Sequence, residues 1–321
     1  MKMWRFIFKR ILQTIPLLVI VSLISFFIIR LSPVDPLAEL RLNPSISQET
    51  LQKEKARLGL DKPIIVQYGL WAKSFVQGDL GVTSSGEKVS VKLAERIPNT
   101  LILTLIVIFM TWSVGVPLGV MGAIYNKSKL DRILTILSSV GMAIPSFFFA
   151  ILLLIFAVKS GLFPVGGLTS YDFNDLSFGG KIIDISRHLV LPVVVLFTIS
   201  LAGLQRQMRA NMLDVLDSDY IKFARAKGLS EFQIIFKHAL RNAINPMITL
   251  LGFEFAGLLS GAALTEYVFQ YPGLGRLILE AVMKSDINLV MASLMIGSIM
   301  LVLGNLIADI LLIITDPRVR G

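Results

Sequence analysis

Six long apolar stretches, separated by hydrophilic connections, constrain the fold of this chain more than any other feature. A helix needs roughly 20 mostly apolar residues to cross the hydrocarbon core of a bilayer. The six stretches span residues 11–29, 100–124, 134–158, 189–204, 246–264 and 289–314. We therefore expect an all-α membrane protein with six transmembrane helices.

The charge content agrees with a membrane location. Only 17% of the 321 residues are charged and 54% are hydrophobic. A soluble domain usually has about a quarter of its residues charged. The net charge of +9 fits basic loops beside the anionic headgroups of membrane lipid. We expect no nucleic acid partner.

The residue types exclude most catalytic and metal-binding chemistry. There is no cysteine, and the two histidines, His188 and His238, lie far apart in the sequence. Gly180-Lys181 is followed by Ile182, where a nucleotide-binding P-loop has Ser or Thr. No metalloprotease or hydrolase motif is present either. We expect no enzyme activity, catalytic residue, metal site or cofactor in this chain.

The basic residues predict the orientation, because cytoplasmic loops of membrane proteins are enriched in Lys and Arg. Basic residues gather in 2–10, 127–132 and 206–241, and they are fewer in the alternate short loops. Both termini are therefore predicted to face the cytoplasm, and the long connection 31–99 to face outward. No small-residue cleavage site follows the first apolar run, so we interpret that run as an uncleaved anchor and not as a signal peptide.

Both long connections contain helix signals. A helix is predicted over 48–58, with Ser47 as its N-cap and Gly59 at its end. In the cytoplasmic connection 206–245, a helix around 220–230 is predicted to begin at Ser218 or Asp219 and to be interrupted by Gly228.

Two carboxylates fall inside apolar stretches, where ionised groups are costly. Glu254 lies near the middle of the fifth stretch and either lines a solute path or pairs with another helix. For Asp309, toward the cytoplasmic end of the sixth, a structural role is favoured. The small-residue pairs Gly115/Gly119 and Gly257/Gly261 indicate close helix packing, with a dimer seam as the alternative.

The segment 219–246 carries the most specific pattern. In physical terms it is a short basic helix, a glycine turn and a second helix that leads into a span, or else an interfacial helix on headgroups. Its residue order resembles the cytoplasmic EAA loop of binding-protein-dependent ABC importer permeases, peptide and nickel branch, although the Glu that names this loop is replaced. The resemblance implies contact with an ATPase by Tyr220, Ala224, Arg225, Ala226, Lys227, Gly228, Leu229, Ser230 and Glu231.

The resemblance covers nearly the whole chain. Matching segments are Gly78-Asp79-Leu80-Gly81, Pro98-Asn99-Thr100-Leu101, Ile144-Pro145-Ser146-Phe147, Glu266 with Phe269 and 272–275, and Asn305 with Asp309 and 316–320. The chain departs from the family at 32–36 and at Glu254, where an amide is usual; the second departure bears on solute choice.

The resemblance implies a type I ABC importer permease bundle in the inner membrane of a prokaryote. Its expected partners are a second homologous permease, two ABC ATPase subunits that hold ATP and magnesium, and an extracytoplasmic solute-binding protein. The expected organisation is a first helix and long loop at 1–98, a five-helix core at 99–315 with coupling loop 206–245, and a cytoplasmic tail at 316–321. The cargo is expected to be dipeptides or oligopeptides carried by alternating access.

Two alternatives to peptide import stay open. The same machinery imports nickel or metal chelates in part of this branch. An ion-coupled secondary transporter is the alternative from another class, and it would need inverted repeats with paired broken helices.

Overall fold

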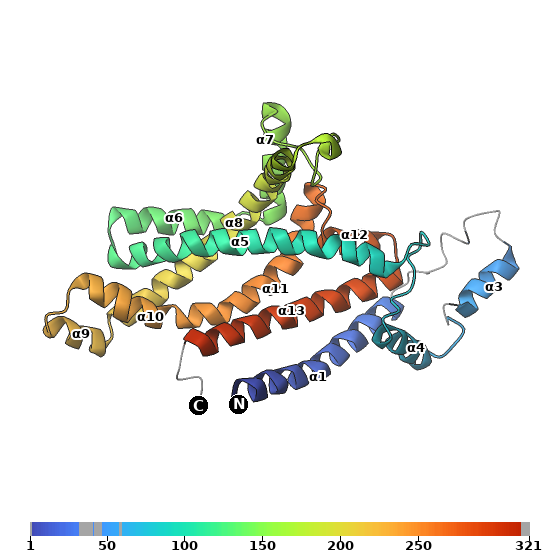
Figure 1. The fold of residues 1–321 in the computed structure, drawn as a ribbon, viewed down its shortest axis with the longest axis horizontal. Coiled ribbons are helices and arrows are strands. Elements are labelled where there is room, and N and C mark those ends of the chain that lie inside the picture. The colour runs from blue at the N-terminus through green and yellow to red at the C-terminus, as the bar shows by residue number, and fades with distance from the viewer. Residues whose placement is uncertain (1, 32–40, 42–46, 58–59, 316–321) are drawn as a thin grey trace.

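The computed structural model describes residues 2–31, 41, 47–57 and 60–315, and this part of the chain is almost entirely helical. An isolated antiparallel bridge between Val82 and Lys88 is its one piece of β-structure. Figure 1 shows an elongated bundle of long helices. The short helices α9 (Asp219–Ala226) and α10 (Leu240–Ala243) lie at one end of the bundle. At the other end lie α3 (Gln48–Arg57), α4 (Ile64–Val76) and α12 (Leu274–Met283).

Helices α5 (Val89–Ile124) and α8 (Phe178–Leu216) form the central pair of the bundle. Gly115 and Gly119 of α5 are buried against α8. A Cβ at Gly115 would lie 2.8 Å from Leu204, and one at Gly119 would lie 2.6 Å from Met208. This confirms that the first glycine pair serves helix packing. For the second pair, a Cβ on Gly257 would meet no atom of the described residues within 4 Å. The surroundings of Gly261 lie outside the described part, so the role of this pair stays a prediction.

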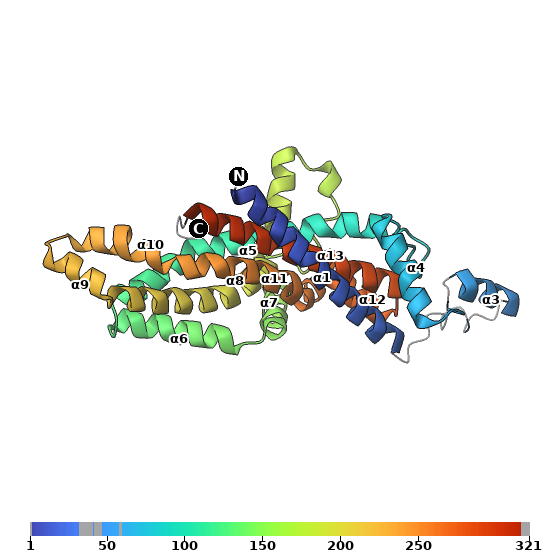
Figure 2. The ribbon, with the colours of Figure 1, turned by 90° about the horizontal axis from the view of Figure 1, so that it is seen from below.

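Helix α1 (Lys2–Leu31) lies against the last helix, α13 (Ile287–Thr315), as Figures 1 and 2 show. Arg10 forms an ion pair with Asp309, with Nε and Oδ2 3.1 Å apart. The carboxylate of Asp309 thus has a structural partner on a neighbouring helix, in line with the role favoured for it.

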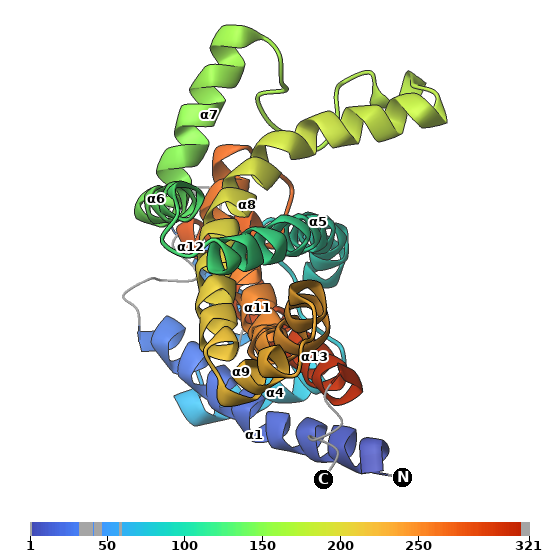
Figure 3. The same ribbon diagram turned by 90° about the vertical axis from the view of Figure 1, so that its left-hand side faces the viewer.

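The third apolar stretch, 134–158, was expected to be one span, and it is not one continuous helix; whether it crosses the membrane as a broken span stays a prediction. It is divided between α6 (Lys129–Ala143) and α7 (Ser146–Ser160), which meet at 95°. Pro145 causes the break, because its ring disfavours the helical conformation at Ile144, which has ψ 120°. Figure 3 shows α7 and the start of α8 projecting from the bundle and diverging from each other.

Four helices of the described part are long and apolar enough to cross a membrane, and a fifth is added if α6 and α7 count as one broken span. These four are at 7–31, 89–124, 178–216 and 287–313. The stretch 246–264 lies in α11 (Asn245–Val268), whose side chains are described only in part. The total of six spans and the orientation stay predictions.

The helices around the hydrophilic connections extend further than expected. Helix α5 begins at Val89, so the boundary proposed at 98/99 falls inside it, and α8 continues through the start of the connection 206–245. Helix α4 (Ile64–Val76) was not predicted. It packs Tyr68 against Phe26 of α1, with ring centroids 5.4 Å apart.

Helix α3 (Gln48–Arg57) confirms the predicted cap, because the Thr50 amide donates to Ser47 Oγ over 3.2 Å. Its expected end at 58–59 lies outside the described residues, as does the tail 316–321. The remaining short elements are η1 (Phe173–Asp175), α9 (Asp219–Ala226), the π-helix η2 (Gln233–Ala239), α10 (Leu240–Ala243) and α12 (Leu274–Met283).

Candidate functional site

The coupling segment, residues 219–239, consists of α9, a glycine turn and the helical run 231–239, which ends in the π-helix η2. Helix α9 ends at Ala226 and not near Ser230 as predicted. The reason is Gly228, whose φ of +80° is the left-handed conformation that closes helices at glycine. Its amide donates to Arg225 O over 2.9 Å, and the Leu229 amide donates to Ala224 O over 3.3 Å. The predicted interruption at Gly228 is confirmed.

One face of the coupling segment is packed into the bundle. Ile221 of α9 and Ile234 of η2 are fully buried. They belong to an apolar cluster with residues of α5, α8, η2, α10 and α11, among them Met208, Met212 and Met247, which are also fully buried. Because protein interiors are close-packed, a displacement of α9 would also displace the residues of α8 and α11 that contact it.

The other face exposes large apolar side chains, which we call the aromatic patch. Its members are Tyr220 (46% exposed), Phe223 (62%), Leu229 (37%), Phe232 (70%) and Phe236 (49%). The rings of Phe232 and Phe236 lie 4.8 Å apart, and Lys227 Nζ lies 4.7 Å from the centre of the Phe223 ring. An exposed apolar patch with charged neighbours at the end of a molecule is typical of a protein docking surface.

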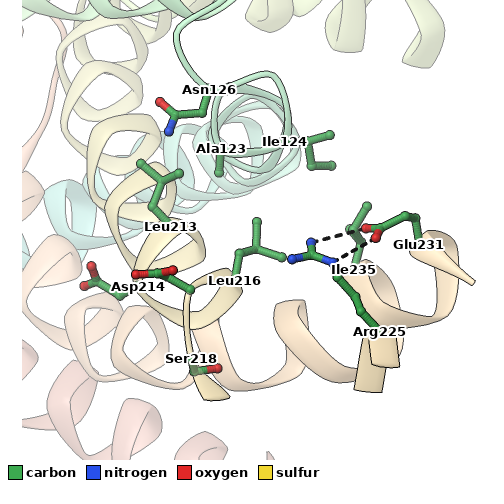
Figure 4. A pocket seen from close by; sticks show the side chains of 11 residues that line it. Ala123, Ile124, Asn126, Leu213, Asp214, Leu216, Ser218, Arg225, Glu231 and Ile235 are labelled. Atoms are coloured by element: carbon green, nitrogen blue, oxygen red, sulfur yellow. Dashed lines mark hydrogen bonds and ion pairs between the residues drawn. The ribbon is translucent and has the colours of Figure 1, made fainter. Parts of the chain in front are cut away.

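Arg225 and Glu231 hold the two arms of the glycine turn together. Arg225 Nε donates to Glu231 Oε1 over 2.8 Å, and its Nη2 donates to Oε2 over 3.3 Å. Figure 4 shows this pair at the wall of an open groove of about 700 Å³, facing the ends of α5 and α8. Of the other residues expected to contact an ATPase, Ala226, Lys227 and Ser230 are exposed and Ala224 is half-buried.

Asp131 and Arg209 fix the loop beside this groove, and the sequence reading did not foresee their contact. Arg209 donates to the buried Asp131 carboxylate from Nε over 2.6 Å and from Nη2 over 2.7 Å. Arg209 also donates to Asn126, which lines the groove. From the sequence, Arg209 is one of several basic residues of a cytoplasmic connection, and no pattern indicates that it pairs with Asp131.

At the opposite end of the bundle, a buried hydrogen-bonded cluster joins α5, α11 and α12, and we call it the Glu266 clamp. Glu266 is fully buried. Its Oε1 accepts from Thr100 Oγ1 over 2.8 Å, and its Oε2 accepts from the Arg276 amide over 2.9 Å. The Leu274 amide in turn donates to Thr100 Oγ1 over 2.7 Å.

The surrounding residues complete the clamp. Tyr271 OH donates to Asn99 O, and Asn99 Nδ2 donates to Pro272 O, each over 2.8 Å. Burial, and then the nearby Glu266 carboxylate, raise the pKa of the Tyr271 hydroxyl above its usual value, so it remains a donor. Gly273 is required for close approach, because a Cβ there would overlap the Glu266 carboxylate. Two segments noted in the sequence, 98–101 and 266–275, are thus in contact.

A third segment of the resemblance, residues 78–81, also lies at this end. The Gly81 amide donates to Asp79 Oδ1 over 3.0 Å, and Gly81 has φ +77°. The following residues bind the start of α13: the Ser84 amide donates to Asp286 Oδ2 over 2.7 Å, and Asn288 Nδ2 donates to Val82 O over 2.9 Å. The long connection is therefore anchored onto the bundle where it re-enters it.

Glu254 lies at the contact of α11 with α5. Its Oε2 accepts a hydrogen bond of 2.8 Å from Trp112 Nε1. The carboxylate therefore has a partner on another helix, and the residue is partly exposed. Both readings of Glu254, as a path-lining group and as a structural one, are compatible with this contact.

Comparisons with known proteins identify the family. A family model described as the inner membrane component of binding-protein-dependent transport systems matches residues 115–321. A model of the N-terminal membrane component of these systems matches residues 3–104. The chain belongs to this family.

Known members of the family match this chain over nearly its full length. It is 40% identical, over 98% of the chain and 99% of the relative, to the oligopeptide transport system permease protein AppB of Bacillus subtilis (strain 168). It is 34% identical, over 99% of both chains, to the dipeptide transport system permease protein DppB of Escherichia coli (strain K12).

A solved structure matches the fold of this inner membrane component. It shows inward-facing conformations of the MetNI methionine ABC transporter and covers 71% of this chain and 97% of the matched chain, with a TM-score of 0.55 and 19% identity. The expected all-helical fold of an ABC importer permease is confirmed. At this identity the likeness extends to the fold alone.

Proposed function

We propose that this chain is one permease subunit of an ATP-driven importer that carries dipeptides or oligopeptides across the inner membrane. The observation that carries the proposal is the coupling segment, with one face buried in the bundle and an aromatic patch exposed on the other. The cargo class is supported by the relatives named as oligopeptide and dipeptide permeases. This likeness favours peptides over nickel.

The aromatic patch is the proposed docking surface for an ABC ATPase subunit. Two such subunits, which bind ATP and magnesium, would lie beneath this chain and a second homologous permease. Closure of the ATPases on ATP would displace α9, and the buried contacts of Ile221 and Ile234 would pass this displacement to α8 and α11. The two permeases would then rock between inward-open and outward-open states about a central path.

The end of the bundle that carries the Glu266 clamp would face outward, and it is the proposed docking surface for a solute-binding protein. The Glu266 clamp and the anchored segment 79–88 make this end stiff. A stiff surface can respond as one body when a loaded binding protein docks, because packed elements do not deform continuously. In this arrangement both termini and the coupling segment face the cytoplasm.

Uptake in cells tests the cargo class. We expect that deletion of the gene abolishes uptake of a radiolabelled di- or tripeptide and leaves uptake of radioactive nickel unchanged, and that a plasmid copy restores peptide uptake. Loss of nickel uptake with normal peptide uptake would contradict the proposal.

Crosslinking tests the docking surface, since the natural chain has no cysteine. Phe232→Cys is expected to crosslink to a cysteine placed in the ATPase, whereas Phe109→Cys, an equally exposed aromatic position in α5 (72% exposed), is the matched control and is expected not to. Equal crosslinking of both would remove the patch from the interface.

A further inference from the structure

Among the residues that the structure describes, the carboxylate of Glu254 has no cationic partner. It is flanked along α11 by apolar residues, and an ionised carboxylate in such a place is costly unless it is hydrated or paired with a cation. Its partner, the indole N–H of Trp112, is a neutral donor that leaves the negative charge in place. No ion pair within the described residues includes Glu254.

The contact with Trp112 orients the carboxylate and leaves acceptor capacity. The indole donates to Oε2 over 2.8 Å, and within the described residues no hydrogen bond is made to Oε1. A carboxylate oxygen accepts from ammonium N–H groups in strong, charge-assisted hydrogen bonds. The Trp112 contact thus orients the carboxylate and leaves Oε1 with acceptor capacity among the described residues.

The described residues leave open space on the surface of α11 next to Glu254. Gly257, one turn along α11, would meet no atom within 4 Å if it carried a Cβ. Residues at i and i+3 lie on the same face of a helix, so this open surface adjoins the carboxylate. Leu250 and Phe253, close by on α11, are 38% and 64% exposed.

We propose that Glu254 is a specificity-determining residue that receives the positively charged amino terminus of the peptide during its passage. This inference rests on the proposed peptide-import function. A free amino terminus supplies three N–H donors and a positive charge, which together satisfy the carboxylate. Trp112 is a positioning residue, because it acts through the carboxylate that it orients.

A structural role and a binding role make different demands on residue 254. The hydrogen bond from the Trp112 indole requires an acceptor at residue 254, and the amide oxygen of Gln supplies one. Recognition of an ammonium group requires the negative charge. Glu254→Gln therefore removes the proposed role while it preserves the helix contact.

The test uses the complete complex, with its ATPases and solute-binding protein, in proteoliposomes. Two peptides of the same sequence are compared, one with a free amino terminus and one with an acetylated amino terminus. The sequence is chosen so that the binding protein binds both peptides with equal affinity. We expect wild-type complex to import the free peptide faster, and Glu254→Gln to lower the free-to-acetylated ratio on the order of tenfold, as loss of a charge-assisted hydrogen bond would. Trp112→Phe should lower the ratio less.

Glu49→Gln, the same change at an exposed carboxylate of α3, is the matched control and should leave the ratio unchanged. An unchanged ratio in Glu254→Gln, or equal loss of both peptides together with a lower melting temperature, overturns the inference. If wild-type complex imports neither peptide with ATP, the proposed function itself fails, so the two failures are distinguishable.

Discussion

Thr100 and Glu266 are 166 residues apart in the sequence, yet their side chains share a buried hydrogen bond of 2.8 Å. This contact joins α5 to α11, and the Leu274 amide on Thr100 adds α12. Because these buried polar groups satisfy one another across three elements, with the Arg276 amide on Glu266 Oε2 as a further donor, α5, α11 and α12 are held in one arrangement. A permease that transmits motion between its two ends needs such stiff connections.

Thr100→Val tests the Glu266 clamp. The substitution keeps the shape but leaves the Leu274 amide and Glu266 Oε1 without their partner, which costs about 1–3 kcal/mol for a buried group. We expect the melting temperature of the purified complex to fall by a few degrees. Thr135→Val, at an exposed position of α6, is the control and should have no effect. Equal melting temperatures for both variants would show that the clamp contributes nothing.

The ion pair of Arg225 with Glu231 is predicted to matter for coupling more than for stability. Both side chains are exposed, 44% and 61%, and such pairs contribute about 0–1 kcal/mol. Arg225→Glu is therefore expected to leave the melting temperature nearly unchanged and to lower ATP-driven uptake, because the two arms of the turn then repel each other.

The double variant Arg225→Glu/Glu231→Arg restores opposite charges and is expected to recover much of the uptake. Uptake that stays low in the double variant would mean that each residue contacts the ATPase directly and that their pairing is incidental.

Single cysteines test the orientation. With a cysteine in place of Gln77 or Gly179, an impermeant thiol reagent is expected to label intact cells. With a cysteine in place of Lys127 or Glu231, it is expected to label only opened membranes. Residues 126 and 231 line one groove, so Lys127 and Glu231 lie at the same end of the bundle. Labelling of the Glu231→Cys variant from outside intact cells would reverse the assigned topology.

Local chemistry made several features predictable from the sequence. Gly228 marked the turn because glycine is the residue that readily adopts positive φ, and Ser47 marked a helix start through its side-chain oxygen. Pro145 was visible too, yet proline is often tolerated within membrane helices. The 95° bend between α6 and α7 depends on packing that the residue type alone does not reveal.

Contacts between distant segments were not predictable. Segments 98–101 and 266–275 could be noted as patterns, but no residue in either segment indicates that the two are in contact. The same holds for Asp131 with Arg209 and for Trp112 with Glu254. In the last case the sequence indicated that Glu254 needs a partner, and the fold supplied a neutral one.

The central claim is that ATP hydrolysis drives peptide import through the coupling segment. Substitutions at Gly228 offer a sharp test, because a Cβ there would meet no described atom within 4 Å. The φ of +80° means that Ala at this position costs about 1–2 kcal/mol of conformational strain. Gly228→Ala is the matched control: it has nearly the same strain as Gly228→Arg but lacks the bulk and charge that would obstruct docking.

The decisive measurement is ATP-dependent uptake of labelled peptide by the reconstituted complex, recorded together with the ATP hydrolysis that the loaded binding protein stimulates. Wild type and Gly228→Ala are expected to import peptide, whereas Gly228→Arg is expected to insert and fold yet lose both uptake and stimulated hydrolysis. Full uptake by Gly228→Arg, or ATP-independent uptake by wild type, would contradict the account.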